Sequence, residues 1–198
     1  MATVITSIRG LQNLGNLENF EADWNSLQTV NLSGLTNLLS VDITDNLTLD
    51  GSSKSLTSAN FSGCTSLEDI LIGRNDFSAG IPNLSGLTNL IRFDSDNCDI
   101  QGNVDLSMIP NPGFDNIDLS ENLGITSVTL PESDLTNLNL FDTALTEAAV
   151  NDILQWLDGS GVTGGSVELD GGTSAAPTGA GITAKDNLIA KSWSVTTN

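Results

Sequence analysis

One short apolar frame recurs along the whole chain and constrains its fold more than any other feature. The frame is L-x-x-L-x-L-x-x-N, in which other apolar residues also occupy the leucine positions. Its last position falls, in chain order, on Asn25, Asn46, Asn75, Cys98, Asn122, Thr143, Gly172 and Asn198. A repeat of this length predicts a solenoid, because a single turn cannot bury its apolar edge whereas stacked turns bury a continuous core.

The segment that precedes each frame repeats as well. "LSGLTNL" occurs at residues 32–38 and 84–90, and it matches "FSGCTSL" at 61–67 and "LQNLGNL" at 11–17. Apolar residues recur there at every third position, which is typical of one face of a tight extended or helical-turn segment. Each unit therefore joins a strand-like half to a compact return.

Together these motifs resemble the leucine-rich-repeat family over residues 8–198. The resemblance implies an α/β fold: a leucine-rich-repeat solenoid of about eight turns, with a parallel concave β-sheet and an irregular convex side. It also implies a structural ladder of side chains that bond the backbone of the neighbouring turn. The expected members are Asn25, Asn46, Asn75, Cys98, Asn122, Thr143 and Asn198. Gly172 has no side chain to donate, so we expect the ladder to break there.

In the C-terminal part the apolar pattern changes from the repeat frame to a helical spacing. We treat residues 1–198 as a single domain, with 1–16 as an N-terminal cap or first turn and 144–198 as helix-containing C-terminal turns. In "LTEAAVNDILQWLDG" the apolar spacing predicts a helix capped by Thr146 and ending at Gly159. A second, shorter helix is expected after Gly181, with Thr183 as its N-cap. This closing segment resembles that of leucine-rich-repeat proteins of phages and bacterial surfaces.

The charge balance narrows the choice of partner. The chain has 25 acidic and 6 basic residues and a net charge of −19. Nucleic acids and anionic membranes require Lys and Arg, so neither is an expected partner. A cationic protein, a divalent metal ion and a neutral glycan remain open. "MATVITSIRG" lacks the features of a secretion signal. From the resemblance we expect a virion or an extracellular or cell-surface location, and a cytoplasmic one stays open.

Carboxylates dominate the predicted concave face. Because strand side chains alternate, the two residues beside the second apolar position of each L-x-L point outward. Eight of these sixteen positions are carboxylates and none is basic. The predicted binding surface is Glu21, Asp23, Asp42, Asp94, Asp96, Asp118, Phe141, Glu168 and Asp170. Its densest part, Asp94, Asp96 and Asp118, suits either a cationic partner or Ca²⁺, which takes several oxygen ligands. The alternative is a face that only maintains solubility.

Catalysis finds less support in the sequence. "GGTSAAP" looks like the surroundings of a subtilisin-type nucleophile, but the chain has no His to activate Ser174. A carboxylate-based glycan hydrolase needs a pair of carboxylates in a cleft with aromatic walls; the predicted face offers such pairs but is open and nearly devoid of aromatics. We therefore predict a monomeric, non-enzymatic module without a cofactor that binds a protein or glycan, in a phage fibre or bacterial adhesin. The alternatives are a structural or assembly element of a virion or surface protein and, third, the hydrolase.

The two cysteines fit the repeat rather than a redox or metal site. Cys64 aligns with Leu35 and Leu87 of the sister segments, so we expect it to be buried in an apolar slot. Cys98 lies on the ladder in another part of the turn. We expect both thiols to be free and slow to react, since burial disfavours the thiolate.

Overall fold

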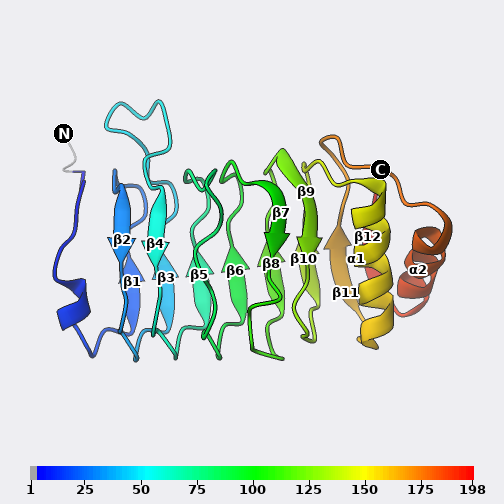
Figure 1. The fold of residues 1–198 in the computed structure, drawn as a ribbon, viewed down its shortest axis with the longest axis horizontal. Coiled ribbons are helices and arrows are strands. Elements are labelled where there is room, and N and C mark those ends of the chain that lie inside the picture. Colours follow the sequence, from blue (N-terminus) through cyan, green and yellow to red (C-terminus); the bar gives the residue numbers. More distant parts are fainter. Residues whose placement is uncertain (1–3) are drawn as a thin grey trace.

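An eight-stranded parallel sheet runs the length of the molecule (Figure 1). The computed structural model describes residues 4–198, so residues 1–3 of the predicted N-terminal cap lie outside the described part. The strands follow one another in the order β1 (Asn19–Glu21), β3 (Ser40–Asp42), β5 (Asp69–Leu71), β6 (Arg92–Asp94), β8 (Asn116–Asp118), β10 (Asn137–Asn139), β11 (Gly165–Glu168) and β12 (Trp193–Thr196). The chain is thus an α/β protein of solenoid-like form.

The register of the sheet matches the sequence frame for seven strands. The aligned central residues are Phe20, Val41, Ile70, Phe93, Ile117, Leu138 and Val167. Each of them is buried, while its two strand neighbours are half-buried or exposed. The pleat therefore sends every second side chain into the core and leaves the others on the open face.

The eighth strand lies two residues away from its predicted register. Val167 pairs with Val195, whereas the frame aligned it with Trp193. Trp193 lies beside Gly165 instead, where a Cβ on Gly165 would come within 2.7 Å of the indole ring. The indole therefore needs a partner without a side chain, and that requirement sets the register.

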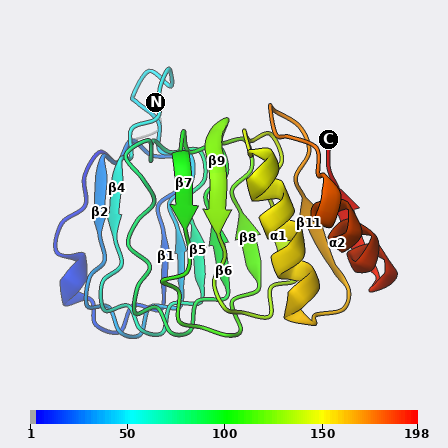
Figure 2. The same ribbon diagram turned by 45° about the vertical axis from the view of Figure 1, so that its right-hand side comes forward.

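The back of the molecule is more regular than the sequence suggested. β2 (Thr29–Asn31) pairs with β4 (Ser58–Asn60), and β7 (Gln101–Asp105) pairs with β9 (Gly124–Thr129), both in parallel. In Figure 2 the back of the molecule faces the viewer, and these strands form a layer nearer the viewer than the main sheet. A 3₁₀ turn at Leu11–Asn13 precedes β1. The polar segment between β3 and β4 projects from the top of the view in Figure 1 as a loop.

Two helices cover the back at the C-terminal end (Figure 2). The first, α1 (Glu147–Ser160), is capped as predicted, since the Thr146 side chain accepts a hydrogen bond from the Ala149 amide. Its C-cap is Gly161, which has a φ of 81°, so the predicted terminating residue, Gly159, lies inside the helix. Its buried residues include Val150, Leu154 and Leu157, which lie on one face of the helix.

The second helix begins earlier than predicted. α2 (Gly179–Ala190) follows Thr178, so Thr183 lies inside the helix and is not its cap. Only glycine fits at position 181, because α1 packs close to it: a Cβ on Gly181 would lie 2.0 Å from Oδ1 of Asn151. Asn151 also accepts from the Thr178 amide at 2.9 Å, which fixes the start of α2. A glycine that argues against a helix in isolation is therefore required here by helix packing.

A single apolar cluster extends from Leu11 to Trp193 and joins the front sheet, the back strands and both helices. Its largest fully buried side chains include Phe61, Phe77, Phe93 and Phe114. Within residues 4–198, no helix has the length and apolar character that crossing a membrane would require.

Candidate binding face and edge cleft

Buried asparagines connect consecutive turns behind the edge of the sheet. Oδ1 of Asn46 accepts from the Leu27 amide at 2.9 Å, and its Nδ2 donates to the Ile43 carbonyl at 2.8 Å and the Ala22 carbonyl at 3.2 Å. Asn75 and Asn122 are fully buried and bond in the same way. Each amide thus satisfies backbone groups of its own turn and of the preceding one.

Other side chains take over where the ladder has no asparagine. The Cys98 thiol donates to the Ile72 carbonyl at 3.2 Å. The Thr143 hydroxyl donates to the Leu140 carbonyl at 2.8 Å and lies 3.1 Å from Oγ of Ser174. Both donate to the carbonyl of the third apolar position of the frame, as the asparagine amides do. Cys98 uses that of the preceding turn and Thr143 that of its own turn.

The ladder does not break at Gly172, contrary to the sequence expectation. A side chain on Gly172 would lie 2.2 Å from the Thr143 carbonyl, so the position has no room for one. Ser174, two residues later, is buried and accepts from the Leu145 amide at 3.2 Å. A displaced hydroxyl therefore replaces the missing amide.

The two ends of the ladder are less buried. Asn25 is half-buried, and its Oδ1 accepts from the Ile5 amide at 2.9 Å. Asn198 is exposed; its Oδ1 accepts from the Gly171 amide and its Nδ2 donates to the carbonyls of Gly171 and Ser174. Because the last strand is shifted in register, Asn198 aligns with the residue that precedes Gly171 in the previous turn.

The open face carries three outward columns rather than two. The additional column, at the first residue of each strand, holds Asn19, Ser40, Asp69, Arg92, Asn116, Asn137, Ser166 and Ser194. It includes an arginine, so the face is not free of cations. The shifted last strand also moves Ser194 beside Ser166 and puts Thr196 beside Glu168.

Several acids on this face have a local structural role. Oδ1 of Asp42 accepts from the Thr44 amide at 3.1 Å, and Oδ1 of Asp118 accepts from the Ser120 amide at 2.9 Å. Asn139 holds the Phe141 amide in the same way at 3.1 Å. A short acidic or amide side chain two residues before a free amide terminates each of these three strands. The pattern D-x-S/T in the sequence carries this signal.

Asp94, Asp96 and Asp118 lie together, as predicted, but arginines partly neutralise them. Nη2 of Arg92 lies 2.9 Å from Oδ2 of Asp94, and Nε of Arg74 lies 3.6 Å from Oδ2 of Asp96. Partial burial, followed by the charges of Asp94 and Asp118, raises the pKa of Asp96 to about 6. Among residues 4–198 no group of three or more His, Cys, Asp or Glu is arranged to hold a metal ion. Calcium binding stays a prediction.

A glycine makes room for this cluster. A Cβ on Gly73 would lie 1.8 Å from Oδ1 of Asp96, so the carboxylate occupies the space that a side chain would fill. The carboxylate is thereby held against the backbone of the neighbouring turn, half-buried between its strand and the next. That position accounts for the desolvation that raises its pKa.

The remaining predicted binding residues are spread along the face. Glu21 on β1 and Glu168 on β11 are exposed and separated by five intervening strands. Asp23 and Asp170 are half-buried near the same two strands. Phe141 is 38% exposed. The structure therefore gives one compact cluster and two outlying acidic ends rather than one site.

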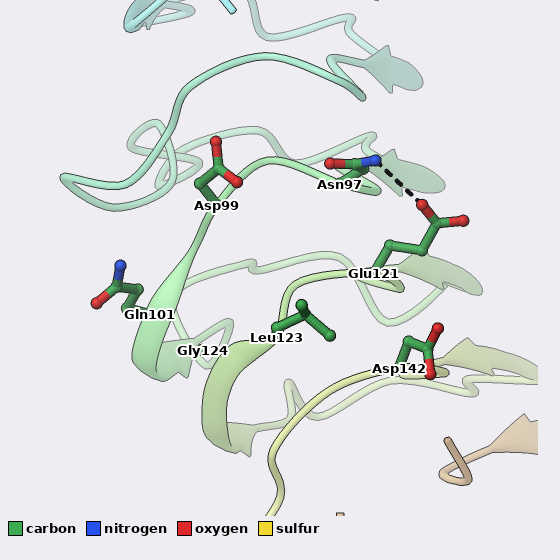
Figure 3. Close-up of a pocket in the computed structure, with 7 residues that line it drawn as sticks. All are labelled: Asn97, Asp99, Gln101, Glu121, Leu123, Gly124 and Asp142. Atoms are coloured by element: carbon green, nitrogen blue, oxygen red, sulfur yellow. Dashed lines mark hydrogen bonds between the residues drawn. The ribbon is translucent and has the colours of Figure 1, made fainter. Parts of the chain in front are cut away.

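An acidic cleft of about 330 Å³ lies at the edge where the chain passes from the front sheet to β7 and β9 (Figure 3). Nδ2 of Asn97 donates to Oε2 of Glu121 across it at 3.0 Å. Lys54 lies at its border, 2.9 Å from Oδ2 of Asp99. The residues that line the cleft are Asn97, Asp99, Gln101, Glu121, Leu123, Gly124 and Asp142.

Three residues of this edge cleft share one position of the repeat. Asn97, Glu121 and Asp142 each precede a ladder residue, and each has a positive φ, of 49°, 59° and 55°. The left-handed turn directs their side chains to the same edge in consecutive turns. The strand columns alone do not include these residues; a polar residue before most of the ladder positions is the signal.

Both cysteines are free and fully buried. Sγ of Cys64 donates to the Leu32 carbonyl at 3.1 Å. Burial raises the pKa of both thiols, that of Cys98 to about 12. The thiols therefore serve packing and backbone bonding, since a protonated buried thiol is a poor nucleophile.

The face and the edge cleft together present closely spaced oxygen acceptors. Carboxylate and amide oxygens bind ammonium, guanidinium and hydroxyl groups. Comparisons of the chain with protein-family models, with curated proteins and with solved structures give no match.

Proposed function

We propose that this chain is a leucine-rich-repeat recognition module of about eight turns that binds a basic protein surface and catalyses no reaction. The observation that carries the proposal is the acidic edge cleft beside an open, acidic front sheet. The in-register strands and the amide ladder support the family resemblance. The resemblance of the closing segment supports a setting in a phage fibre or bacterial adhesin.

The distribution of cations favours a positively charged partner. Four of the six basic residues, Lys54, Arg74, Arg92 and Lys191, already lie in ion pairs with aspartates. The net charge of −19 therefore leaves most carboxylates without a counter-ion on the protein. Such a field accelerates association with a basic surface and repels acidic ones.

The edge cleft is better suited than the aspartate cluster to receive a basic side chain. Arg74 and Arg92 partly neutralise the cluster, whereas Glu121 and Asp142 have no ion pair within residues 4–198. Leu123 is 68% exposed at the border of the cleft, where it offers an apolar contact to the methylene stem of Lys or Arg. The centre of recognition thus shifts from the predicted cluster to this edge.

A protein partner is favoured over a glycan on this face, and binding over catalysis. Phe141 is the only aromatic side chain in the two outward columns that the sequence identified, and sugar sites rely on aromatic surfaces. Ser174 is buried and bonded to Thr143, so its hydroxyl is inaccessible to a substrate.

The proposal is tested by titrating ¹⁵N-labelled protein with an oligolysine peptide at low and at physiological ionic strength. We expect backbone shifts at Asn97, Glu121 and Asp142, and weaker binding as salt rises. The variant Glu121→Gln/Asp142→Asn should bind several-fold more weakly. The control Glu147→Gln/Asp186→Asn removes the same charge from the helices and should bind nearly as the parent does.

Two results would contradict the proposal. Shifts spread evenly over all acidic surfaces, or equal losses in the two double variants, would mean that only net charge attracts the peptide. A rise in melting temperature with Ca²⁺ that Asp94→Asn/Asp96→Asn abolishes would instead assign the face to a metal ion.

A further inference from the structure

A groove on the back of the molecule lies between α1 and the chain that leads out of β9. One hollow of about 490 Å³ is lined by Pro112, Glu132, Ser133, Asp134, Gln155, Trp156, Gly159 and Ser160. A second hollow of about 230 Å³ is lined by Val128, Thr129, Leu130, Asp152, Ile153 and Trp156. The two hollows meet at Trp156, which lines both. The larger hollow is in the size range of small-molecule sites, and the smaller one lies below it.

One face of α1 forms a wall of this groove. Asp152, Trp156 and Gly159 are spaced four and three residues apart, so they project from the same side of the helix. Trp156 is half-buried and packs against the apolar core, which fixes the position of its ring. The opposite wall is held in place because the Asp134 amide donates to the Pro112 carbonyl at 2.9 Å. The groove is thus built on rigid elements.

Trp156 differs from the other buried tryptophan in its hydrogen bonding. Nε1 of Trp193 donates to the Val162 carbonyl at 3.2 Å. No hydrogen bond of Nε1 of Trp156 is found within residues 4–198. An indole N–H without a protein partner, on a ring that faces two hollows, remains available to a ligand.

Ser133 gives an independent indication of a ligand. Its Oγ is buried and has no hydrogen-bond partner among the described residues. A buried hydroxyl without a partner costs free energy, and native structures seldom leave one without a reason. Ser133 lines the larger hollow, next to Glu132 and Asp134. Because this Oγ has no surface that water can reach, a ligand hydroxyl would bond it only after rotation about the Cα–Cβ bond of Ser133 turns the hydroxyl into the hollow.

We propose that this groove binds a neutral sugar, with one pyranose ring stacked on Trp156. The C–H groups of a pyranose carry small positive partial charges, which the electron-rich face of an indole attracts. Ser133 and Gln155 supply donors as well as acceptors, and Glu132 and Asp152 accept from sugar hydroxyls. The three carboxylates of the groove and the absence of any basic lining residue among the described ones exclude anionic sugars.

The shape of the groove favours a sugar over a simple cation. An ammonium group needs one aromatic face and converging carboxylates, whereas two hollows adjoin this ring and the groove offers hydroxyl and amide donors. A chain of at least two sugar units would occupy both hollows. The site lies on the back of the molecule and is independent of the function proposed for the front face.

The proposal is tested on a glycan array that spans neutral, amino, sialylated and sulfated sugars, followed by calorimetry with the best neutral oligosaccharide. We expect neutral sugars to bind and to change the tryptophan fluorescence. Trp156→Leu should weaken binding at least tenfold. Trp24→Leu changes a tryptophan that is 67% exposed at the other end of the molecule, and it should leave binding unaltered.

Ser133→Ala distinguishes a binding role from a structural one. Removing a buried hydroxyl that has no partner should leave the melting temperature unchanged or slightly higher, while sugar binding weakens several-fold. Binding confined to sialylated, sulfated or amino sugars, the absence of any bound sugar, or equal affinity in the parent and Trp156→Leu would each overturn the proposal. Choline chloride serves as the cationic probe. If choline binds the parent but not Trp156→Leu, and no sugar binds, the groove would be assigned to cations.

Discussion

Two polar columns run along this molecule side by side, and they differ in burial rather than in chemistry. In the ladder, Asn122 is fully buried and accepts backbone amides of the preceding turn. In the outward column, Asp118 is half-buried and accepts the amide of Ser120 in its own turn. Both use a side-chain oxygen to satisfy a backbone N–H that the strand geometry leaves free.

The difference shows where a repeat protein can vary its sequence for function. A ladder amide bonds on all sides, so it contributes stability and has nothing left to offer a ligand. An outward aspartate uses one oxygen for its cap and keeps other lone pairs directed to solvent, or to a neighbour as Asp118 does with Asn139. Binding chemistry therefore belongs to the outward column and the adjacent edge cleft.

The largest effect is expected from removing a ladder amide. Asn122→Ala should lower the free energy of unfolding by about 3 kcal/mol or more, because two amides and three carbonyls lose a buried partner. Urea unfolding measures the change. Asn46→Ala should fall in the same range. A loss below about 1 kcal/mol for both would mean that water replaces the amide and that the ladder is dispensable.

The hydroxyl side chains of the ladder should contribute less to the free energy of unfolding than its amides. Thr143→Val keeps the volume and removes one donor, so we expect a loss of about 1–2 kcal/mol. Ser174→Ala should cost a similar amount, and the double variant less than the sum, because the two hydroxyls bond each other. Strictly additive losses in denaturant unfolding would contradict a coupled pair.

In the outward column, a substitution at Asp96 is expected to raise the free energy of unfolding at neutral pH rather than lower it. The pKa of Asp96, raised to about 6 by burial and by Asp94 and Asp118, means that its ionised form destabilises the fold above about pH 6. Asp96→Asn should therefore stabilise the protein by about 1 kcal/mol near pH 7.5, a figure reduced for its partial exposure.

That advantage should disappear as the pH falls. Near pH 4 Asp96 is protonated in the folded protein, and the parent and Asp96→Asn should have equal stability. Asp105→Asn is a control on the back strand β7, where hydrogen bonds from Ser107 lower the carboxyl pKa, so that variant should lose stability instead. Chemical unfolding at both pH values measures the difference. A pH-independent effect of Asp96→Asn would exclude titration as its cause.

The smallest effect is expected from exposed amides that bridge turns. Nδ2 of Asn89 donates to the Thr65 carbonyl at 2.7 Å, but in full contact with water. Asn89→Ala should cost about 0.5 kcal/mol, since water replaces the donor. Asn37, which bonds the Gly15 carbonyl, provides a second example. Losses equal to that of Asn122→Ala would refute burial as the source of the difference between the columns.

The period of the apolar frame was sufficient to predict the sheet, its register over seven strands and the ladder positions from Asn25 to Thr143, but not the part taken by Ser174. It failed at β12 because a shift by two residues keeps the same face buried, and only the fit of Trp193 over Gly165 resolves the choice. It failed at the start of α2 because helix propensity disfavours Gly179 and Gly181, and the close packing of α1 against Gly181 overrides it. Both errors arise from contacts between distant residues.

The candidate site was less accessible from sequence for a related reason. Alternation identified outward positions on the strands, but the edge cleft depends on left-handed residues such as Asn97 and Glu121, which follow the strands. The groove joins helix α1 to loop residues that lie more than 20 positions before Trp156 in the sequence. No local pattern indicates that these segments meet.

The in-register pairing of successive strands has a mechanical consequence. Neighbouring partners such as Phe20 and Val41, or Val41 and Ile70, are 21 and 29 residues apart, and each strand bonds only the strands beside it. A molecule stretched from its two ends should therefore lengthen in discrete steps of roughly 70–100 Å, one per released turn. Force applied across a sequence of such interfaces is limited by the weakest of them, while the remaining turns stay folded.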